Sequence, residues 1–92
     1  MGRARLKIYA PLGQVAGHTF DVDLPQPCPL LDLLRAMADQ HGFAHQLFEA
    51  PDRLKQSYTV LVNGTSVYYL DGASTLVHDG DEIAVLAFVT GG

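Results

Sequence analysis

The sequence predicts an α+β fold in which a mixed five-stranded sheet packs on one main helix. Two runs of alternating apolar and polar residues, 4–10 and 18–24, open the chain and are typical of strands. Residues 29–41 then carry apolar side chains at helical spacing. Two further strand-like runs follow, and an apolar segment that begins at Ile83 completes the sheet. A chain of this length suffices for one core, so we expect residues 1–92 to form a single domain.

The first two runs are expected to pair as an antiparallel hairpin. Pro11, Gly13 and Gly17 mark the turn between them. The first run alternates an apolar set with a largely cationic set: Ala4, Leu6, Ile8 and Ala10 with Arg5, Lys7 and Tyr9. In the second run, Asp21 and Asp23 stand on the polar side. Pairing would bring these opposite charges onto neighbouring strands. Each such pair stabilises the sheet by roughly a few tenths of a kcal/mol.

Residues 29–41 are predicted to form the main helix. Pro29 suits its first position, where the missing N–H is not needed, and Gly42 is expected to end it. The apolar stripe that would cover the sheet consists of Leu30, Leu31, Leu34, Met37 and Ala38. Each larger side chain buried there contributes about 1.5–3 kcal/mol before entropy is subtracted. Residues 43–56 are expected to contain a helical turn before Pro51.

A second hairpin is predicted between residues 57–63 and 65–70. Asn63-Gly64 lies at its tip and is typical of a type I′ turn, because both central residues of that turn need a positive φ. Tyr68 and Tyr69 would then point to opposite faces of the return strand, one packed and one exposed.

The last strand is expected to carry a surface for a partner protein. Two turns lead into this strand, Asp71-Gly72 and Asp79-Gly80-Asp81. If Ile83 and Val85 face the helix, alternation places Leu86 and Phe88 on the open face of the sheet. Large apolar side chains there reduce solubility unless another protein covers them. We therefore predict that Leu86, Phe88 and Val89 contact a partner; the alternative is that Phe88 folds back on the core.

The last strand continues into a tail, residues 89–92, that we expect to be flexible. Thr90 is followed by Gly91 and Gly92, which have no Cβ and so fit a slot too narrow for any other residue. The chain would present a carboxylate at the end of a thin tether. An ordinary frayed terminus is also flexible, so the two glycines alone do not decide the function.

Composition narrows the classes of function. Hydrophobic residues make up 48% and charged residues 17%, as in a folded globule. The net charge of −4 disfavours nucleic acid and anionic membranes as partners. Without a signal peptide or a bilayer-spanning run, the expected location is the cytoplasm. Cys28 is the only cysteine, which excludes an internal disulfide and a Cys₄ cluster, and Pro-Cys-Pro supplies no neighbour that would activate its thiol.

Neither a metal site nor a catalytic site is expected. His41 and His45 have the spacing of a metal-binding pair, but Gly42 lies between them and no third ligand is evident. The acidic turns lack the alternating oxygen ligands of a calcium loop. No nucleophile, base and orienting group can be assembled, so the chain is not expected to be an enzyme.

The order of the elements makes the helix a crossover, with the first and last strands parallel at the centre and the hairpins antiparallel outside them. This is the β-grasp, or ubiquitin-like, arrangement. Six motifs along nearly the whole chain resemble the MoaD and ThiS group of sulfur carriers: Leu30-Leu31-Asp32-Leu33-Leu34, Val60-Leu61-Val62-Asn63-Gly64, Leu70-Asp71-Gly72, Thr75, Asp79-Gly80-Asp81-Glu82-Ile83 and Gly91-Gly92.

The resemblance implies a carrier that works through the carboxylate of Gly92. An E1-like adenylyltransferase of the MoeB or ThiF type would adenylate this carboxylate with ATP, and a donor such as a cysteine desulfurase or rhodanese would supply sulfur to form a thiocarboxylate. No permanently bound cofactor is implied. The chemistry is reasonable because a terminal carboxyl, with a pKa of about 3.5, is an anion at neutral pH and can attack the α-phosphate of ATP.

Length and residues 43–56 favour the small subunit of molybdopterin synthase over the shorter thiazole carriers, with the large subunit of that enzyme as a partner. Three alternatives stay open. The chain could carry sulfur for thiamine thiazole, cysteine or tRNA thiolation. It could be a ubiquitin-like modifier joined through Gly92 to lysines of other proteins, or a plain interaction domain that does not need Gly92.

Overall fold

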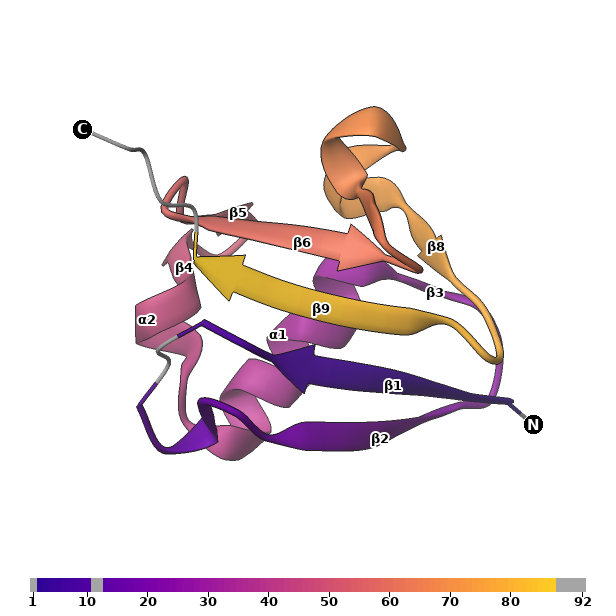
Figure 1. Cartoon of the computed structure of the whole chain (residues 1–92), viewed down its shortest axis with the longest axis horizontal. Helices are drawn as coiled ribbons and strands as arrows, with labels where there is room; N and C mark the ends of the chain where they lie inside the picture. The colour runs from indigo at the N-terminus through magenta and orange to yellow at the C-terminus, as the bar shows by residue number, and fades with distance from the viewer. Residues whose placement is uncertain (1, 11–12, 88–92) are drawn as a thin grey trace.

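The computed structural model describes residues 2–10 and 13–87 (Figure 1). Its main sheet has the order β2-β1-β9-β6-β7. The bounds of these strands, in chain order, are Gly2–Ile8 (β1), Thr19–Leu24 (β2), Tyr58–Val62 (β6), Thr65–Ser66 (β7) and Glu82–Ala87 (β9). Among the described residues, no helix has the length and apolar character needed to cross a membrane.

Smaller elements complete the fold around the main helix, α1 (Leu30–His41). Two pairs of short strands lie outside the main sheet: β3 (Cys28–Pro29) with β8 (Leu76–Val77), and β4 (Phe48–Ala50) with β5 (Arg53–Leu54). The other helical segments are η1 (Gly13–Val15), α2 (Ala44–Leu47), η2 (Val67–Tyr69) and η3 (Gly72–Ser74).

The first and last strands lie side by side at the centre of the sheet, as predicted. β1 and β9 are parallel, with Leu6 opposite Ile83 and Ile8 opposite Val85. β2 and β6 flank them, each antiparallel to its neighbour. Figure 1 shows α1 behind the sheet, on one of its two faces. The predicted β-grasp fold, a mixed five-stranded sheet on one main helix, is therefore confirmed.

The core lies between α1 and the covered face of the sheet. The helix buries five side chains there: Leu30, Leu33, Leu34, Met37 and Ala38. The predicted stripe omitted Leu33, which is buried, and included Leu31, which packs against the core but is only partly buried. Counting i, i+3, i+4 and i+7 from Leu30 reaches Leu33 and not Leu31, which is only partly buried.

The ends of α1 agree with the sequence to within one residue. Pro29 is not the first helical residue as predicted; it has an extended backbone, φ −57° and ψ 138°, at the N-cap. The reason is that Pro29 pairs with Leu76 in the short β3–β8 ladder, so the helix begins one residue later. Gly42 ends the helix as predicted, with φ 78° and its N–H donating to the carbonyl of Ala38.

Residues 43–56 form α2 and the β4–β5 pair. The predicted helical turn is present, but the strand pair after it was not predicted. Phe43 and Leu47 are almost completely buried, at 1% and 0% exposure. This segment therefore extends the hydrophobic core beyond the end of α1.

The Asn63-Gly64 turn is confirmed, whereas the return strand after it is shorter than predicted. Asn63 and Gly64 have φ values of 53° and 85°. Only Thr65–Ser66 forms a strand, because the hydroxyl of Ser66 accepts a hydrogen bond from the amide of Tyr68 and the chain turns into η2. As a result, Tyr68 and Tyr69 are both exposed, at 84% and 79%, and the prediction that one packs is wrong.

Candidate functional site

The candidate site is the carboxyl-terminal strand β9 together with the residues that follow it. The predicted roles of Phe88, Val89, Thr90, Gly91 and Gly92 fall outside the described residues and stay predictions. The structure instead describes how the chain is held immediately before them.

Strand β9 is paired along its whole length, and its central residues are paired on both sides. It pairs with β1 from Glu82 to Val85 and with β6 from Ile83 to Ala87. The carbonyl of Val85 also accepts hydrogen bonds from the amides of Tyr9 and Ala10, at 2.9 and 3.0 Å. Ile83 and Val85 are fully buried toward α1, as predicted. A rigid strand thus fixes where the tail begins.

Leu86 lies on the open face of the sheet, where alternation predicted it. Its neighbours there are Thr59, which is opposite Leu86, and the pair formed by Leu61 and Ala84. All four side chains are half-buried and uncharged. Leu86 therefore lies in a small uncharged surface near the end of β9. The prediction that Leu86 contacts a partner protein is consistent with this open-face position.

The other half of the open face is charged. Arg3 pairs with Asp23 at 3.5 Å and Arg5 with Asp21 at 3.7 Å across the β1–β2 hairpin. The sequence predicted that the cations of β1 face Asp21 and Asp23, and Arg5 does so. Lys7 differs: it pairs with Glu82 of β9 at 3.1 Å, because β9 is its other neighbour in the sheet. Exposed pairs of this kind contribute little to stability.

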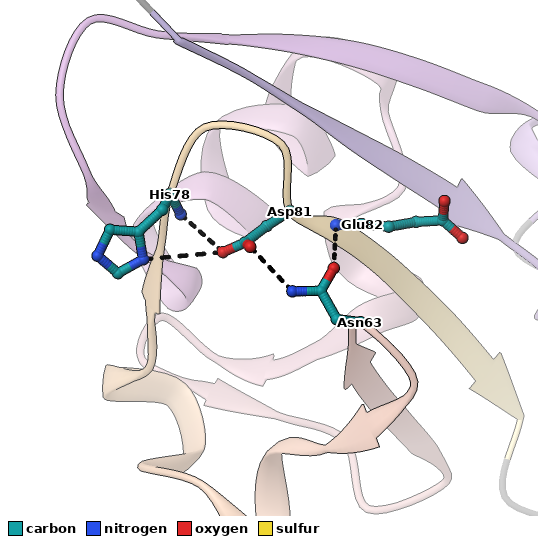
Figure 2. A network of polar contacts seen from close by, with 4 residues as sticks. All are labelled: Asn63, His78, Asp81 and Glu82. Atoms are coloured by element: carbon teal, nitrogen blue, oxygen red, sulfur yellow. Dashed lines mark hydrogen bonds and ion pairs between the residues drawn. The ribbon is translucent and has the colours of Figure 1, made fainter.

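A polar network fixes the entrance of β9 (Figure 2). The carboxylate of Asp81 accepts a hydrogen bond from the amide of His78 at 2.8 Å and another from the side-chain amide of Asn63 at 2.9 Å. The Asn63 side-chain oxygen in turn accepts from the amide of Glu82 at 2.9 Å. From the sequence, Asn63 and Asp81 were predicted only as turn residues, and no contact between the two turns was predicted. The hairpin tip at Asn63 is thereby fastened to the first residue of β9.

Asn63→Gly should lower the free energy of unfolding by about 1–2 kcal/mol, because two partly exposed side-chain hydrogen bonds are lost while glycine accepts the positive φ. Asn63→Ala should be about 1 kcal/mol less stable than Asn63→Gly, because alanine is strained in the left-handed backbone conformation of this position. Urea denaturation of the three proteins measures both steps. Equal stability of Asn63→Gly and the wild type would contradict the fastening role of the network.

Cys28 lies in the short strand β3, beside the start of α1. Burial raises the pKa of its thiol, the Asp32 carboxylate raises it further, and a backbone hydrogen bond from Leu33 acts in the opposite direction. A raised pKa leaves less thiolate at a given pH. This environment agrees with the prediction that Cys28 is not a reactive nucleophile.

Alkylation of Cys28 by iodoacetamide should therefore be slower in the folded protein than in the protein unfolded by guanidinium, at the same pH. The rate of the folded protein should also rise at a higher pH than the value of about 8.5 typical of free cysteine. The unfolded protein is the matched control, because it has the same single thiol without the burial. A folded-state midpoint at or below that of the unfolded chain would contradict the assignment.

His41 and His45 have the four-residue spacing of a metal-binding pair, but they are not part of a metal-binding cluster among the described residues. The ring of His41 packs against Phe20, with centroids 4.3 Å apart. Within residues 2–10 and 13–87, no group of three or more His, Cys, Asp or Glu side chains is placed to hold a metal ion.

One helix packed on a mixed sheet, with the last strand at its centre, defines a ubiquitin-like protein. The ThiS family model matches residues 6–92, and the chain belongs to the ThiS family. This confirms the family at the level of the ThiS group; the narrower likeness to the small subunit of molybdopterin synthase is not shown. Small ThiS-family proteins are carriers or modifiers and not enzymes, which confirms the prediction that this chain is not an enzyme.

Three relatives are similar in sequence or structure. Small archaeal modifier protein 3 of Haloferax volcanii is 40% identical over 62 residues, an alignment that covers 66% of this chain and 66% of the relative, just under two thirds of its length. The solution structure of small archaeal modifier protein 1 from Methanosarcina acetivorans has a TM-score of 0.79 at 29% identity and covers 100% of this chain and 98% of that chain. The crystal structure of small archaeal modifier protein 1 from Haloferax volcanii has a TM-score of 0.79 at 28% identity, with coverage of 99% and 100%.

Proposed function

We propose that this chain is a ubiquitin-like protein modifier that is joined through Gly92 to lysine side chains of other proteins. The observation that carries this proposal is the similarity to proteins named modifiers, at 40% identity in one case and over the whole fold in another. The Gly91-Gly92 end of the sequence supplies the group that such a reaction needs.

The chemistry requires no catalytic side chain of this protein. In a partner E1-like enzyme, an oxygen of the Gly92 carboxylate attacks the α-phosphate of ATP, and pyrophosphate leaves. The resulting mixed anhydride has AMP as its leaving group. The amine of a target lysine then attacks the Gly92 carbonyl carbon, loses a proton and displaces AMP, which forms an isopeptide bond.

Three features of the fold support the proposal. Strand β9 pairs with β6 as far as Ala87, the last described residue, so the chain is held in place up to the start of the tail. Leu86 and its half-buried neighbours offer an apolar surface next to that point. The net charge of −4 suits an activating enzyme with a basic groove.

Sulfur transfer is a second candidate, and the match to the ThiS family model favours it. The adenylated Gly92 is the shared intermediate. The persulfide of a cysteine desulfurase or rhodanese would displace AMP in place of a lysine amine and form an acyl disulfide with Gly92. A second thiol would then attack the sulfur of the donor enzyme, form a disulfide with it and release the thiocarboxylate. Molybdopterin synthesis, which the sequence favoured, is then one possible use of the sulfur, and the names of the relatives above support the modifier better.

The test uses the full chain with an amino-terminal tag, expressed in its own host with and without Gly92. The modifier predicts a ladder of larger tagged proteins on a blot, present only with Gly92. No lysine or arginine follows Lys55, so trypsin leaves a long remnant on the target. Chymotrypsin, which cuts after Phe88, would leave Val89-Thr90-Gly91-Gly92 on the modified lysine, and peptide mass spectrometry would locate it.

Intact-mass analysis of the free protein separates the two candidates. An oxygen-to-sulfur mass increment at Gly92, without any ladder, would favour the carrier over the modifier. Both signals together would indicate that one adenylate serves both reactions. If neither signal is seen with an E1-like enzyme and ATP present, both candidates are ruled out.

A further inference from the structure

A groove runs between the edge strand β2 and the helix α1. It has a volume of about 370 Å³ and is lined by the residues from Val22 to Pro29 and by one side of α1: Asp32, Leu33, Ala36 and Met37. Figure 1 shows β2 as the outer strand of the sheet with α1 behind it. The groove is separate from the surface around Leu86.

The floor of this groove is apolar and incompletely covered. Phe20 and Val22 of β2 face the helix side of the sheet, next to Leu6 and Ala4 of β1. Leu6 and Ala4 are buried at 0% and 2% exposure, whereas Phe20 and Val22 are only partly buried. Of these two, Val22 lines the groove, and Phe20 packs against the ring of His41. The helix thus covers the central strands but leaves the inward side of β2 partly open.

The backbone of β2 is also free on its outer side. In β1, the backbone groups of the odd-numbered residues point toward β9. The amide of Arg5 donates to the carbonyl of Asp81, and just after β1 the amide of Tyr9 donates to the carbonyl of Val85. The even-numbered residues therefore bond to β2, where Ile8 donates to His18. Successive residues of a strand direct their backbone groups to opposite sides, so the amides and carbonyls of Thr19, Asp21 and Asp23 point away from β1. In the described sheet, β2 has β1 as its one neighbour.

Three carboxylates lie around the free edge. Asp21 and Asp23 lie on the open face of β2, and Asp32 lies on the helix side of the groove. The residues that line the groove include no lysine or arginine. Arg3 and Arg5 approach the two β2 carboxylates, but Asp21 and Asp23 are still 58% and 87% exposed. An approaching chain would therefore meet a mainly acidic rim.

We propose that β2 and this groove bind an extended segment of a partner protein in which apolar and basic residues alternate. The segment adds to the sheet as a sixth strand beside β2, and its backbone bonds to Thr19, Asp21 and Asp23. Its apolar side chains enter the groove over Val22. Its lysines or arginines face Asp21 and Asp23 on the open face, as in other cross-strand pairs. A length of about four to six residues matches an ordinary short strand.

This site lies away from the end of β9, after which the proposed modifier tail begins. Leu24 pairs with Gly2 at one end of the hairpin, whereas the end of β9 lies beyond the opposite end of β1, where Ile8 is opposite Val85. The segment can therefore bind while the tail is engaged elsewhere or joined to a target. The proposal does not depend on Gly92, so it stands or fails separately from the proposed function.

The experiment titrates the ¹⁵N-labelled full chain with a synthetic peptide of alternating valine and lysine. Amide shifts are expected along Thr19–Leu24 and along α1 near Ala36. A peptide with glutamate in place of lysine should bind at least about tenfold more weakly, which corresponds to about 1.4 kcal/mol. Binding of the lysine peptide should weaken further as salt is raised.

Two matched variants locate the site. Ala36→Arg places a long cation in the groove from an exposed helical position, where arginine favours the helix, and should weaken binding at least about tenfold. Gln46→Arg adds the same cation on the exposed side of α2, away from the groove, and should bind like the wild type. Unchanged spectra at millimolar peptide, equal binding of the glutamate peptide, or self-association of the chain through β2 in sedimentation would each overturn the proposal.

Discussion

Removal of Gly92 alone should abolish conjugation and thiocarboxylate formation without changing the stability of the fold. The shortened chain still ends in a carboxylate, at Gly91, but that group lies one residue, about 3.5 Å, short of the α-phosphate of ATP. A misplacement of about 1 Å can already reduce a rate by about a hundredfold. ATP–pyrophosphate exchange with the E1-like enzyme measures the activation step directly.

The length-matched control for this deletion is Gly91→Ala. It keeps the carboxylate in register and adds one methyl group where the predicted slot is narrow. We expect activity in the order wild type, Gly91→Ala, deletion. The thermal melting curve should be the same for all three, because neither change alters a residue of the core or of the paired strands. Normal exchange by the protein that lacks Gly92 would refute the role of this residue.

The central part of the fold was predictable because local patterns encode it. Alternation at Leu6, Ile8, Ile83 and Val85 marks strands buried on one face, and these residues form the parallel centre of the sheet. The Asn63-Gly64 turn was equally clear, since few other residue pairs accept two positive φ values.

The errors arose where tertiary contacts or a single side chain override the local pattern. The sequence of residues 65–70 suits a strand, but the Ser66 hydroxyl bonds to the amide of Tyr68 and ends the strand early. The β3–β8 pair has two residues in each strand, too few to show a period. Its pairing at Pro29 nevertheless decides where α1 begins.

The candidate site divides in the same way. The open-face position of Leu86 follows from alternation, so the sequence predicts it directly. The tail chemistry is implied only by the resemblance to sulfur carriers and stays a prediction. The bonds of Asn63 to Asp81 and Glu82 join residues 18 and 19 positions apart, and turn signals alone do not reveal that the two turns meet. The groove beside β2 depends on how far α1 covers Val22, which only the packed structure determines.

The second large effect is expected in the core. Leu34→Ala should lower the free energy of unfolding by about 2–5 kcal/mol, because Leu34 is fully buried between α1 and the sheet. For a domain of this size, such a loss should lower the melting temperature by at least about 10 °C. Thermal and urea denaturation measure the two quantities.

Leu31→Ala is the matched control, since it removes the same atoms from the same helix at a partly buried position. It should lower the free energy of unfolding by about 1 kcal/mol or less. Equal losses from the two substitutions would mean that the buried face of α1 is assigned incorrectly. The comparison also concerns function: Ile83 and Val85 are fully buried in the same core as Leu34, so weakening the core at Leu34 should also weaken the support of the strand that holds the start of the tail.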